Sequence, residues 1–228
     1  SAAGDLAIGQ QVQAAGNLLL SAGGAASDLT LNAAVTNSGG NSSLVAGRDL
    51  LQNAGMNATA AGKSVELRAG RDIVMAQAAA SSANNGNILL AAAGSVTISS
   101  LNAGSANVGI AAATGSIVDG DAAGDTAVDI VAGGLQLRAG NAIGSGANAI
   151  ETNVVIATAQ AGAGGVYLAE TNALTLAGVT VQVNRVGATG TAVATTDAAR
   201  NGVSAQGGNV VLVSNGASLV VNGAVASN

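Results

Sequence analysis

Residues 46–76 read AGRDLLQNAGMNATAAGKSVELRAGRDIVMA, and this stretch decides the fold because one phrase occurs in it twice. The phrase AGRDL at positions 46–50 returns as AGRDI at positions 69–73 (69 − 46 = 23). Between the copies, VELR at positions 65–68 alternates apolar and polar residues, as a strand with one buried face does. A unit that restarts after about 23 residues with this alternation indicates stacked repeats, each of which buries its apolar face against the next.

Short apolar-x-apolar pairs recur along the whole chain. Residues i and i+2 of a strand face the same side, so each pair supplies two inward side chains of a short strand. The pairs are Leu6/Ile8, Leu18/Leu20, Leu29/Leu31, Val65/Leu67, Ile73/Met75, Ile88/Leu90, Val96/Ile98, Val108/Ile110, Val128/Ile130, Leu135/Leu137, Val154/Ile156, Val166/Leu168, Leu174/Leu176, Val179/Val181, Val210/Leu212 and Leu219/Val221. Clusters of Gly, Asn and Ser separate them and supply the backbone freedom that sharp corners need.

The spacing of successive strand starts gives the size of one turn. The starts are Leu50, Ile73, Val96, Ile117 and Leu135, whose sequence numbers differ by 23, 23, 21 and 18. This range is typical of a parallel β-helix with two or three short strands per turn. The chain is therefore predicted to be all-β, a single parallel β-helix (β-solenoid) with essentially no helix. At about 21 residues and ~4.8 Å per turn, it would have about eleven rungs and a length of roughly 50 Å.

The amino-acid composition also favours a β-solenoid. The chain is 49% hydrophobic, yet it has no Phe, Trp, Pro, Cys or His, and Tyr167 is its one aromatic residue. A core of Ala, Val, Leu and Ile needs a narrow, regular interior in which small side chains stack on their own kind. Nucleic-acid binding is disfavoured because the net charge is −5 and there is no basic patch. Membrane insertion is not expected either, since no apolar run approaches ~18 residues.

We expect one solenoid segment, residues 1–228, of a longer chain, because the first residues already read as the middle of a repeat. Within it, residues 1–120 are regular and residues 121–228 carry degenerate repeats with longer loops. The longest polar excursions are residues 143–152 and 185–202, and insertions of this kind in a solenoid usually leave one face as loops.

The phrases AGNLLLSAG (15–23), AGRDLLQNAG (46–55) and AGKSVELRAGRDIVMA (61–76) resemble the haemagglutinin repeats of filamentous-haemagglutinin-like exoproteins. The resemblance is clearest over roughly residues 4 to 120. It implies a right-handed β-helix in a large bacterial surface adhesin that is secreted by a two-partner pathway. It also implies that this repeat region carries no catalytic residues.

Charged and amide residues in the repeats predict polar ladders along the rod. Stacked one turn apart, Arg48-Asp49 would lie over Arg71-Asp72, so that each Arg leans toward the Asp of the neighbouring turn. Asn37, Asn41, Asn53 and Asn57 are expected to form amide stacks at corners.

One acidic stretch is a candidate metal site. Asp119, Asp121 and Asp125 lie in a Gly-containing loop and are followed by Asp129. Carboxylates close together could supply the oxygen ligands that Ca²⁺ prefers. The spacing departs from the EF-hand pattern, and the alternative is a solvated acidic turn. No cofactor is expected, and calcium is the alternative that stays open.

Catalysis is a further alternative, because β-helices also occur in polysaccharide lyases and hydrolases. Glu151 and Glu170 lie about one turn apart (170 − 151 = 19) and could be neighbours. They lack an aromatic or basic companion, and the absence of His and Cys removes the usual nucleophilic catalysts. The chain is therefore not expected to be an enzyme.

The sequence favours a structural or adhesive rod segment of a large secreted bacterial surface protein, acting in adhesion, biofilm matrix or host-cell attachment. Its partners would be neighbouring repeats or copies end to end, and host or matrix glycans or proteins. One alternative is a subunit of a self-assembling extracellular filament, and another is a carbohydrate-active β-helix enzyme.

Overall fold

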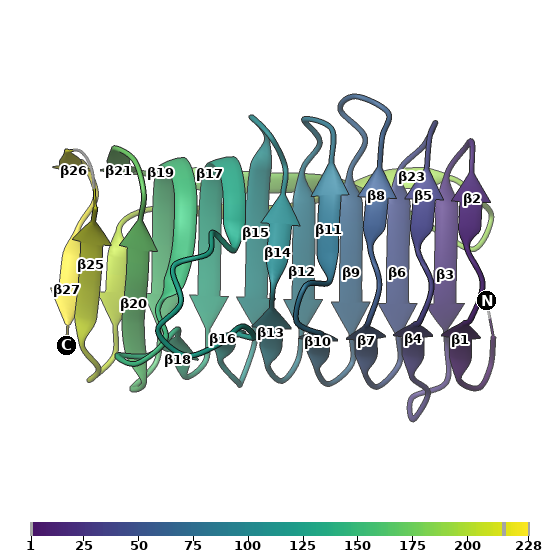
Figure 1. Cartoon of the computed structure of the whole chain (residues 1–228), viewed down its shortest axis with the longest axis horizontal. Coiled ribbons are helices and arrows are strands. Elements are labelled where there is room, and N and C mark those ends of the chain that lie inside the picture. The colour runs from purple at the N-terminus through teal and green to yellow at the C-terminus, as the bar shows by residue number, and fades with distance from the viewer. Residues whose placement is uncertain (1, 216–217, 228) are drawn as a thin grey trace.

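The structure is a parallel β-solenoid of about ten turns, seen in a computed structural model that describes residues 2–215 and 218–227. In Figure 1 the strands stand upright side by side along the rod, with the N-terminus at the right and the C-terminus at the left. The described residues contain no helix, and thus none that could span a bilayer. The predictions of an all-β solenoid, of about eleven rungs and of essentially no helix are confirmed.

The first five turns share one plan, with three short strands each. Turns 1 to 3 hold β1 (Leu6–Ile8), β2 (Val12–Ala14), β3 (Leu18–Ala22), β4 (Leu29–Leu31), β5 (Val35–Asn37), β6 (Ser42–Ala46), β7 (Leu50–Gln52), β8 (Met56–Ala58) and β9 (Val65–Ala69). Turns 4 and 5 hold β10 (Ile73–Met75), β11 (Ala80–Ala83), β12 (Ile88–Ala92), β13 (Val96–Ile98), β14 (Ser100–Asn102) and β15 (Asn107–Ala112). Ala2 forms a bridge with Ala22 ahead of turn 1.

Turns 6 and 7 each have two strands, one of them long, whereas turns 8 and 9 again have three strands each. Turns 6 and 7 hold β16 (Ile117–Asp119), β17 (Ile130–Ala139), β18 (Ala142–Ile143) and β19 (Ile150–Ala161). Turn 8 holds β20 (Gly165–Glu170), β21 (Leu174–Leu176) and β24 (Val203–Ala205), with β22 (Val179–Val186) and β23 (Ala192–Arg200) inserted between the last two. Turn 9 holds β25 (Val210–Ser214), β26 (Leu219–Val221) and β27 (Val225–Ser227).

The core consists of columns of aliphatic side chains, one residue per turn. In-register pairing places equivalent positions of successive turns directly over one another. One column is Leu20, Leu44, Leu67, Leu90, Ile110 and Leu137. A second is Leu6, Leu29, Leu50, Ile73, Val96, Ile117, Ile143, Val166 and Val210. Because each column meets its own kind, small branched residues fill the interior without aromatic rings.

The glycine of the repeated AGRD phrase is required by a close approach between turns. A Cβ on Gly47 would lie 1.8 Å from the carbonyl oxygen of Gly24, and one on Gly70 would lie 2.0 Å from that of Gly47. Distances this short are far below van der Waals contact, so only glycine lets the corners stack.

The predicted Arg–Asp ladder is confirmed. Arg71 forms an ion pair with Asp49, and Arg48 forms the equivalent pair with Asp28 of the turn before. Each Asp also accepts a backbone N–H from the following turn, as in the bond from Asp72 to Asp49. The Arg48 side chain, hydrogen bonded to Asp28, lowers the pKa of that carboxyl group. Half-exposed pairs of this kind contribute little individually.

The amide ladders form in part. Asn41 and Asn53 each bond to an asparagine of the turn before, and Asn57 bonds to a serine. The bonds are Asn41 to Asn17, Asn53 to Asn32, and Ser82 to Asn57. The prediction is wrong for Asn57, whose partner is a hydroxyl group, and for Asn37, whose side chain bonds to Ser42 and to backbone groups of its own corner.

The column of strand starts departs from the predicted spacing after Ile117. Its partner in the next turn is Ile143 (143 − 117 = 26), whereas Leu135 pairs with Val108 on another face. The interpretation of Leu135 as the next start is wrong because residues 120–129 extend this turn between β16 and β17. We call residues 120–128 the acidic loop.

The largest departure from the repeat is an antiparallel hairpin formed by β22 and β23. Figure 1 shows it as a pale green band behind the upright strands, at right angles to them and reaching almost to the N-terminal end. We call residues 179–200 the axial hairpin. The interpretation of residues 185–202 as a loop leaving the rod is wrong, and Val179/Val181 is not a pair within a turn, because these residues lie along the rod.

Buried valines hold the axial hairpin against the side of the rod. They are Val179, Val181, Val183 and Val186. Val181 packs over Gly109, where an added Cβ would come within 3.2 Å of the valine side chain. The hairpin therefore covers apolar wall that would otherwise be solvent-exposed.

Candidate metal centre: a buried carboxylate cluster

Three carboxylates that are far apart in the sequence meet inside turns 6 and 7. Asp119 is the last residue of β16, Asp129 directly precedes β17, and Glu151 is the second residue of β19. Because Ile130 pairs with Thr152 in parallel register, the residues that precede them, Asp129 and Glu151, also lie one above the other. Asp119 lies at the other end of the acidic loop from Asp129 and completes the group.

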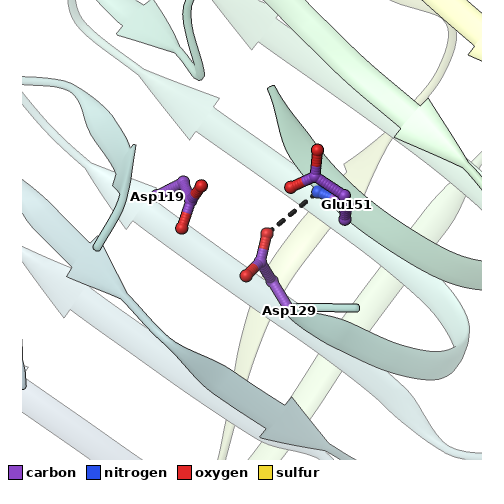
Figure 2. Close-up of side chains that lie close together, drawn as sticks. All are labelled: Asp119, Asp129 and Glu151. Carbon is purple, nitrogen blue, oxygen red and sulfur yellow. Dashed lines mark hydrogen bonds between the residues drawn. The ribbon is translucent and has the colours of Figure 1, made fainter. Parts of the chain in front are cut away.

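The three groups are close and shielded from water. One ligand oxygen from each lies within 4.8 Å of the others. The exposed fractions are 5% for Asp119, 1% for Asp129 and 9% for Glu151. Figure 2 shows the three side chains converging from separate segments, with Asp129 directed toward Glu151. We call this group the carboxylate cluster.

Backbone groups fix two of the three side chains. Asp129 Oδ2 accepts the backbone N–H of Glu151 at 2.9 Å. Asp119 Oδ1 accepts the backbone N–H of Asp121 at 2.8 Å. Each carboxyl group keeps one buried oxygen with no hydrogen-bond partner among the described residues: Asp119 Oδ2, Asp129 Oδ1 and Glu151 Oε2. Buried acceptors without partners are rare, so the three oxygens need an explanation.

Burial controls the protonation of the carboxylate cluster. It raises the pKa of Asp129 from 3.8 to about 8, and the neighbouring charges of Asp119 and Glu151 add to the rise. Burial also raises the pKa of Asp119 and that of Glu151 above their ordinary values. Such groups either hold a proton near neutral pH or need a positive charge close by.

The structure brings together only one of the three residues predicted as a calcium site. Asp119 lies in the carboxylate cluster. Asp121 accepts a hydrogen bond from Ser99 Oγ at 3.2 Å, and Asp125 Oδ1 accepts the backbone N–H of Ala127 at 2.9 Å. The residues that flank the acidic loop, Asp119 and Asp129, therefore belong to the cluster, while Asp121 and Asp125 inside the loop bond to other groups.

Sequence reasoning noticed Asp129 and Glu151 but did not join them. The signal was present, since the two residues differ by 22 positions (151 − 129), which is one turn, and each flanks an Ile that begins the apolar part of a strand. Asp119 could not be placed beside them without knowing the path of the acidic loop.

The predicted pair of Glu151 and Glu170 does not form. Their strands are neighbours, but Thr152 pairs with Glu170 and Ala169 pairs with Glu151. Glu170 is fully buried, and its carboxylate accepts Thr152 Oγ1 at 2.7 Å and the backbone N–H of Val154 at 3.2 Å. It fixes a corner, whereas Glu151 joins the carboxylate cluster.

A second polar feature lies where the axial hairpin ends. A groove of about 410 Å³ is lined by Arg138, Gln160 and Arg200, among others. Arg200 Nη1 donates to Gln160 Oε1 at 2.9 Å, while the Nε atoms of both arginines lack a partner among the described residues. Planar guanidinium groups suit carboxylate or sulfate groups, so this groove could hold an acidic ligand.

Searches against protein-family models, curated proteins and solved structures return no match to this chain.

Proposed function

We propose that this chain is a stiff structural segment of an extracellular rod, part of a large secreted bacterial surface protein that acts in adhesion, biofilm matrix or host-cell attachment. The observation that carries the mechanical part is the axial hairpin, which is bonded to each of the first seven turns. Its contacts, from turn 1 to turn 7, are Asn17 to Gly190, Val186 to Ser43, Arg185 to Glu66, Asn87 to Gln182, Asn107 to Thr180, Gln136 to Ala198, and Arg200 to Gln160.

The physical consequence is resistance to bending and to loss of turns. In a solenoid each turn contacts only its neighbours, so a rod can open at any interface between turns. Because the axial hairpin crosses every interface from turn 1 to turn 7, its contacts must break before any of these interfaces can open. The axial hairpin therefore stiffens the part of the rod that it covers.

The cellular part of the proposal rests on sequence. The phrases at residues 15–23, 46–55 and 61–76 resemble repeats of secreted bacterial adhesins that are exported by two-partner secretion. A stiff rod is also what such a protein needs in order to present binding surfaces away from a cell.

Electron microscopy of the native protein, together with the intact mass of its chain, tests the proposal. We expect thin single rods and a chain much heavier than 21.2 kDa. A variant with residues 180–199 replaced by a short Gly-Ser linker should give rods that bend more.

Two outcomes would contradict this function. Long fibres built from a chain near 21.2 kDa would favour a self-assembling filament. Release of reducing sugar from a polysaccharide, lost in both Glu151→Gln and Glu170→Gln, would favour a carbohydrate-active enzyme.

A further inference from the structure

The negative charge of the carboxylate cluster is not neutralised by the described residues. Ionised, its three side chains carry three negative charges at exposures of 1–9%. No described Lys or Arg pairs with any of them, since the ion pairs within the described part of the chain all lie elsewhere. Uncompensated buried charge is costly, so protons or a cation must neutralise the cluster.

Protons alone do not readily neutralise the cluster. Asp129 Oδ2 accepts the backbone N–H of Glu151, the bond drawn in Figure 2. A proton shared between the neighbouring carboxyl groups of Asp129 and Glu151 neutralises one of the three charges and leaves two. Each residue keeps one buried oxygen without a hydrogen-bond partner among the described residues, and one ligand oxygen of each lies within 4.8 Å of the others.

We propose that Asp119, Asp129 and Glu151 form a binding site for a divalent cation, with Ca²⁺ as the ion that fits best. The ligands would be Asp119 Oδ2, Asp129 Oδ1 and Glu151 Oε2. Hard oxygen donors in an irregular arrangement suit Ca²⁺, whereas Mg²⁺ demands near-ideal octahedral geometry. The chain has no His or Cys, so it lacks the softer ligands that Zn²⁺ and Cu²⁺ prefer.

Ca²⁺ takes six to eight oxygen ligands, so three carboxyl groups would need water or further protein oxygens to complete its coordination. A small pocket of about 140 Å³ is lined by Asp119, Ser145 and Asn148, although Asp129 and Glu151 do not line it. Asp125 adds negative charge from the acidic loop, close enough to raise the pKa of Asp119 and of Glu151.

A cation here would fasten the irregular part of the rod. Asp119 and Asp129 stand at the two ends of the acidic loop, and Glu151 belongs to the following turn. One ion would therefore close the loop and tie turn 6 to turn 7. The ion would stabilise the contact between these two turns, as columns of apolar side chains and Arg–Asp pairs do in the regular turns.

Calcium binding to the full chain after treatment with a chelator tests the proposal. Isothermal titration with CaCl₂ should give one site, with a Kd of about 10⁻⁴ M or tighter, and Ca²⁺ should raise the melting temperature. Asp129→Asn should weaken binding at least tenfold, because it removes one charged ligand. The variant should still fold, since the Asn oxygen can accept the same Glu151 N–H.

Asp5→Asn is the matched control. Asp5 Oδ1 also accepts a backbone N–H from the next turn, that of Asp28 at 2.9 Å, but it lies in turn 1, far from the cluster. It should bind Ca²⁺ as the unmodified chain does. MgCl₂ in place of CaCl₂ should bind at least tenfold more weakly, and equal binding would overturn the choice of Ca²⁺.

Two results would overturn the site itself. One is the absence of any Ca²⁺-dependent heat or rise in melting temperature in the unmodified chain, which would leave protons as the occupants of the cluster. The other is an equal response in the unmodified chain and in Asp129→Asn, which would place the ion elsewhere.

Discussion

Turns 1 to 5 and turns 6 to 9 handle charge in opposite ways on the same fold. In the first region, Asp28 and Asp49 lie at corners beside an Arg of the next turn, and the pKa of Asp28 is lowered by its bond to Arg48. In the second region, Asp129 is buried without a basic partner among the described residues, and its pKa rises to about 8. The two regions treat their carboxylates differently because the turn length is nearly constant in the first region and varies in the second.

A repeat of constant length lets every side chain meet its equivalent one turn away. The same Arg–Asp pair can then form between successive turns, and leucine side chains pack on leucine side chains of the next turn. The acidic loop and the axial hairpin break that period, so side chains meet partners that no repeat specifies. Buried polar groups gather at these breaks, which is where specific chemistry usually lies in repeat proteins.

The largest effect is expected from the core of the regular turns. Leu67 is fully buried between Leu44 and Leu90 in one apolar column. Leu67→Ala should lower the free energy of unfolding by about 2–5 kcal/mol, because the stacked turns on both sides cannot collapse into the cavity. Urea denaturation followed by circular dichroism measures it.

Val155→Ala provides the control in the irregular region. Val155 is 59% exposed, so its truncation should change stability by less than about 0.5 kcal/mol. Equal losses in the two variants would mean that the aliphatic column does not hold the rod together.

An intermediate effect is expected where the axial hairpin meets the regular turns. Glu66 is fully buried, accepts Ser43 Oγ at 3.2 Å, and pairs with Arg185 through Nε at 2.8 Å. Arg185→Met should cost about 3 kcal/mol, because it leaves a buried carboxylate without its cation. Adding Glu66→Gln should recover most of the loss, since the amide is neutral and still accepts from Ser43.

Arg71→Met is the comparison for an exposed pair. The Arg71 side chain is 59% exposed in its ion pair with Asp49, so its loss should cost about 0.5 kcal/mol. Thermal melts of both Arg variants in low and high salt would show the contrast. A cost for Arg71→Met as large as that for Arg185→Met would mean that the exposed ladder matters as much as the hairpin.

The smallest effect concerns pH, and the two regions should respond in opposite directions. The pKa of Asp129 is about 8 in the folded chain and near 3.8 when unfolded. Between these values the folded state holds a proton that the unfolded state has lost, so stability falls as pH rises. With a chelator present, the unfolding free energy should drop by up to about 2.6 kcal/mol between pH 5 and pH 7.

Two Asp→Asn variants separate the regions. Asp129→Asn should flatten the decline in stability above pH 5. Asp28 has a lowered pKa, so its stabilisation is present above about 3.8 and is lost as pH falls further. Asp28→Asn should therefore lower stability by a nearly constant amount above about pH 4 and flatten the acid side of the profile. Urea midpoints measured from pH 2 to pH 9 test both, and a decline above pH 5 of unchanged size in Asp129→Asn would contradict the assignment.

Much of the fold could be predicted from local pattern. The AGRD phrase and the apolar pairs specified strand positions, inward faces and the turn length, because period-2 alternation and a fixed repeat act within one turn and the next. The Arg–Asp ladder followed from the same spacing. Leu135 was wrongly predicted to be a strand start of the same column, because the acidic loop lengthens turn 6. No local pattern shows which face of the solenoid a strand belongs to.

The carboxylate cluster and the axial hairpin lay beyond this reasoning. Val179 and Val181 show the same alternation whether a strand belongs to a turn or runs along the rod. Arg185 and Glu66 are 119 residues apart, and no repeat connects them.

The sequence by itself determined a parallel solenoid with a small aliphatic core, because each turn needs only its own repeat and the next one to bury its apolar face. Only the tertiary structure decided where the chain folds back along the rod and which acids meet inside it. Those contacts depend on the path of two insertions, and that path is set by the apolar wall and the buried partners that they find on turns far away in the sequence.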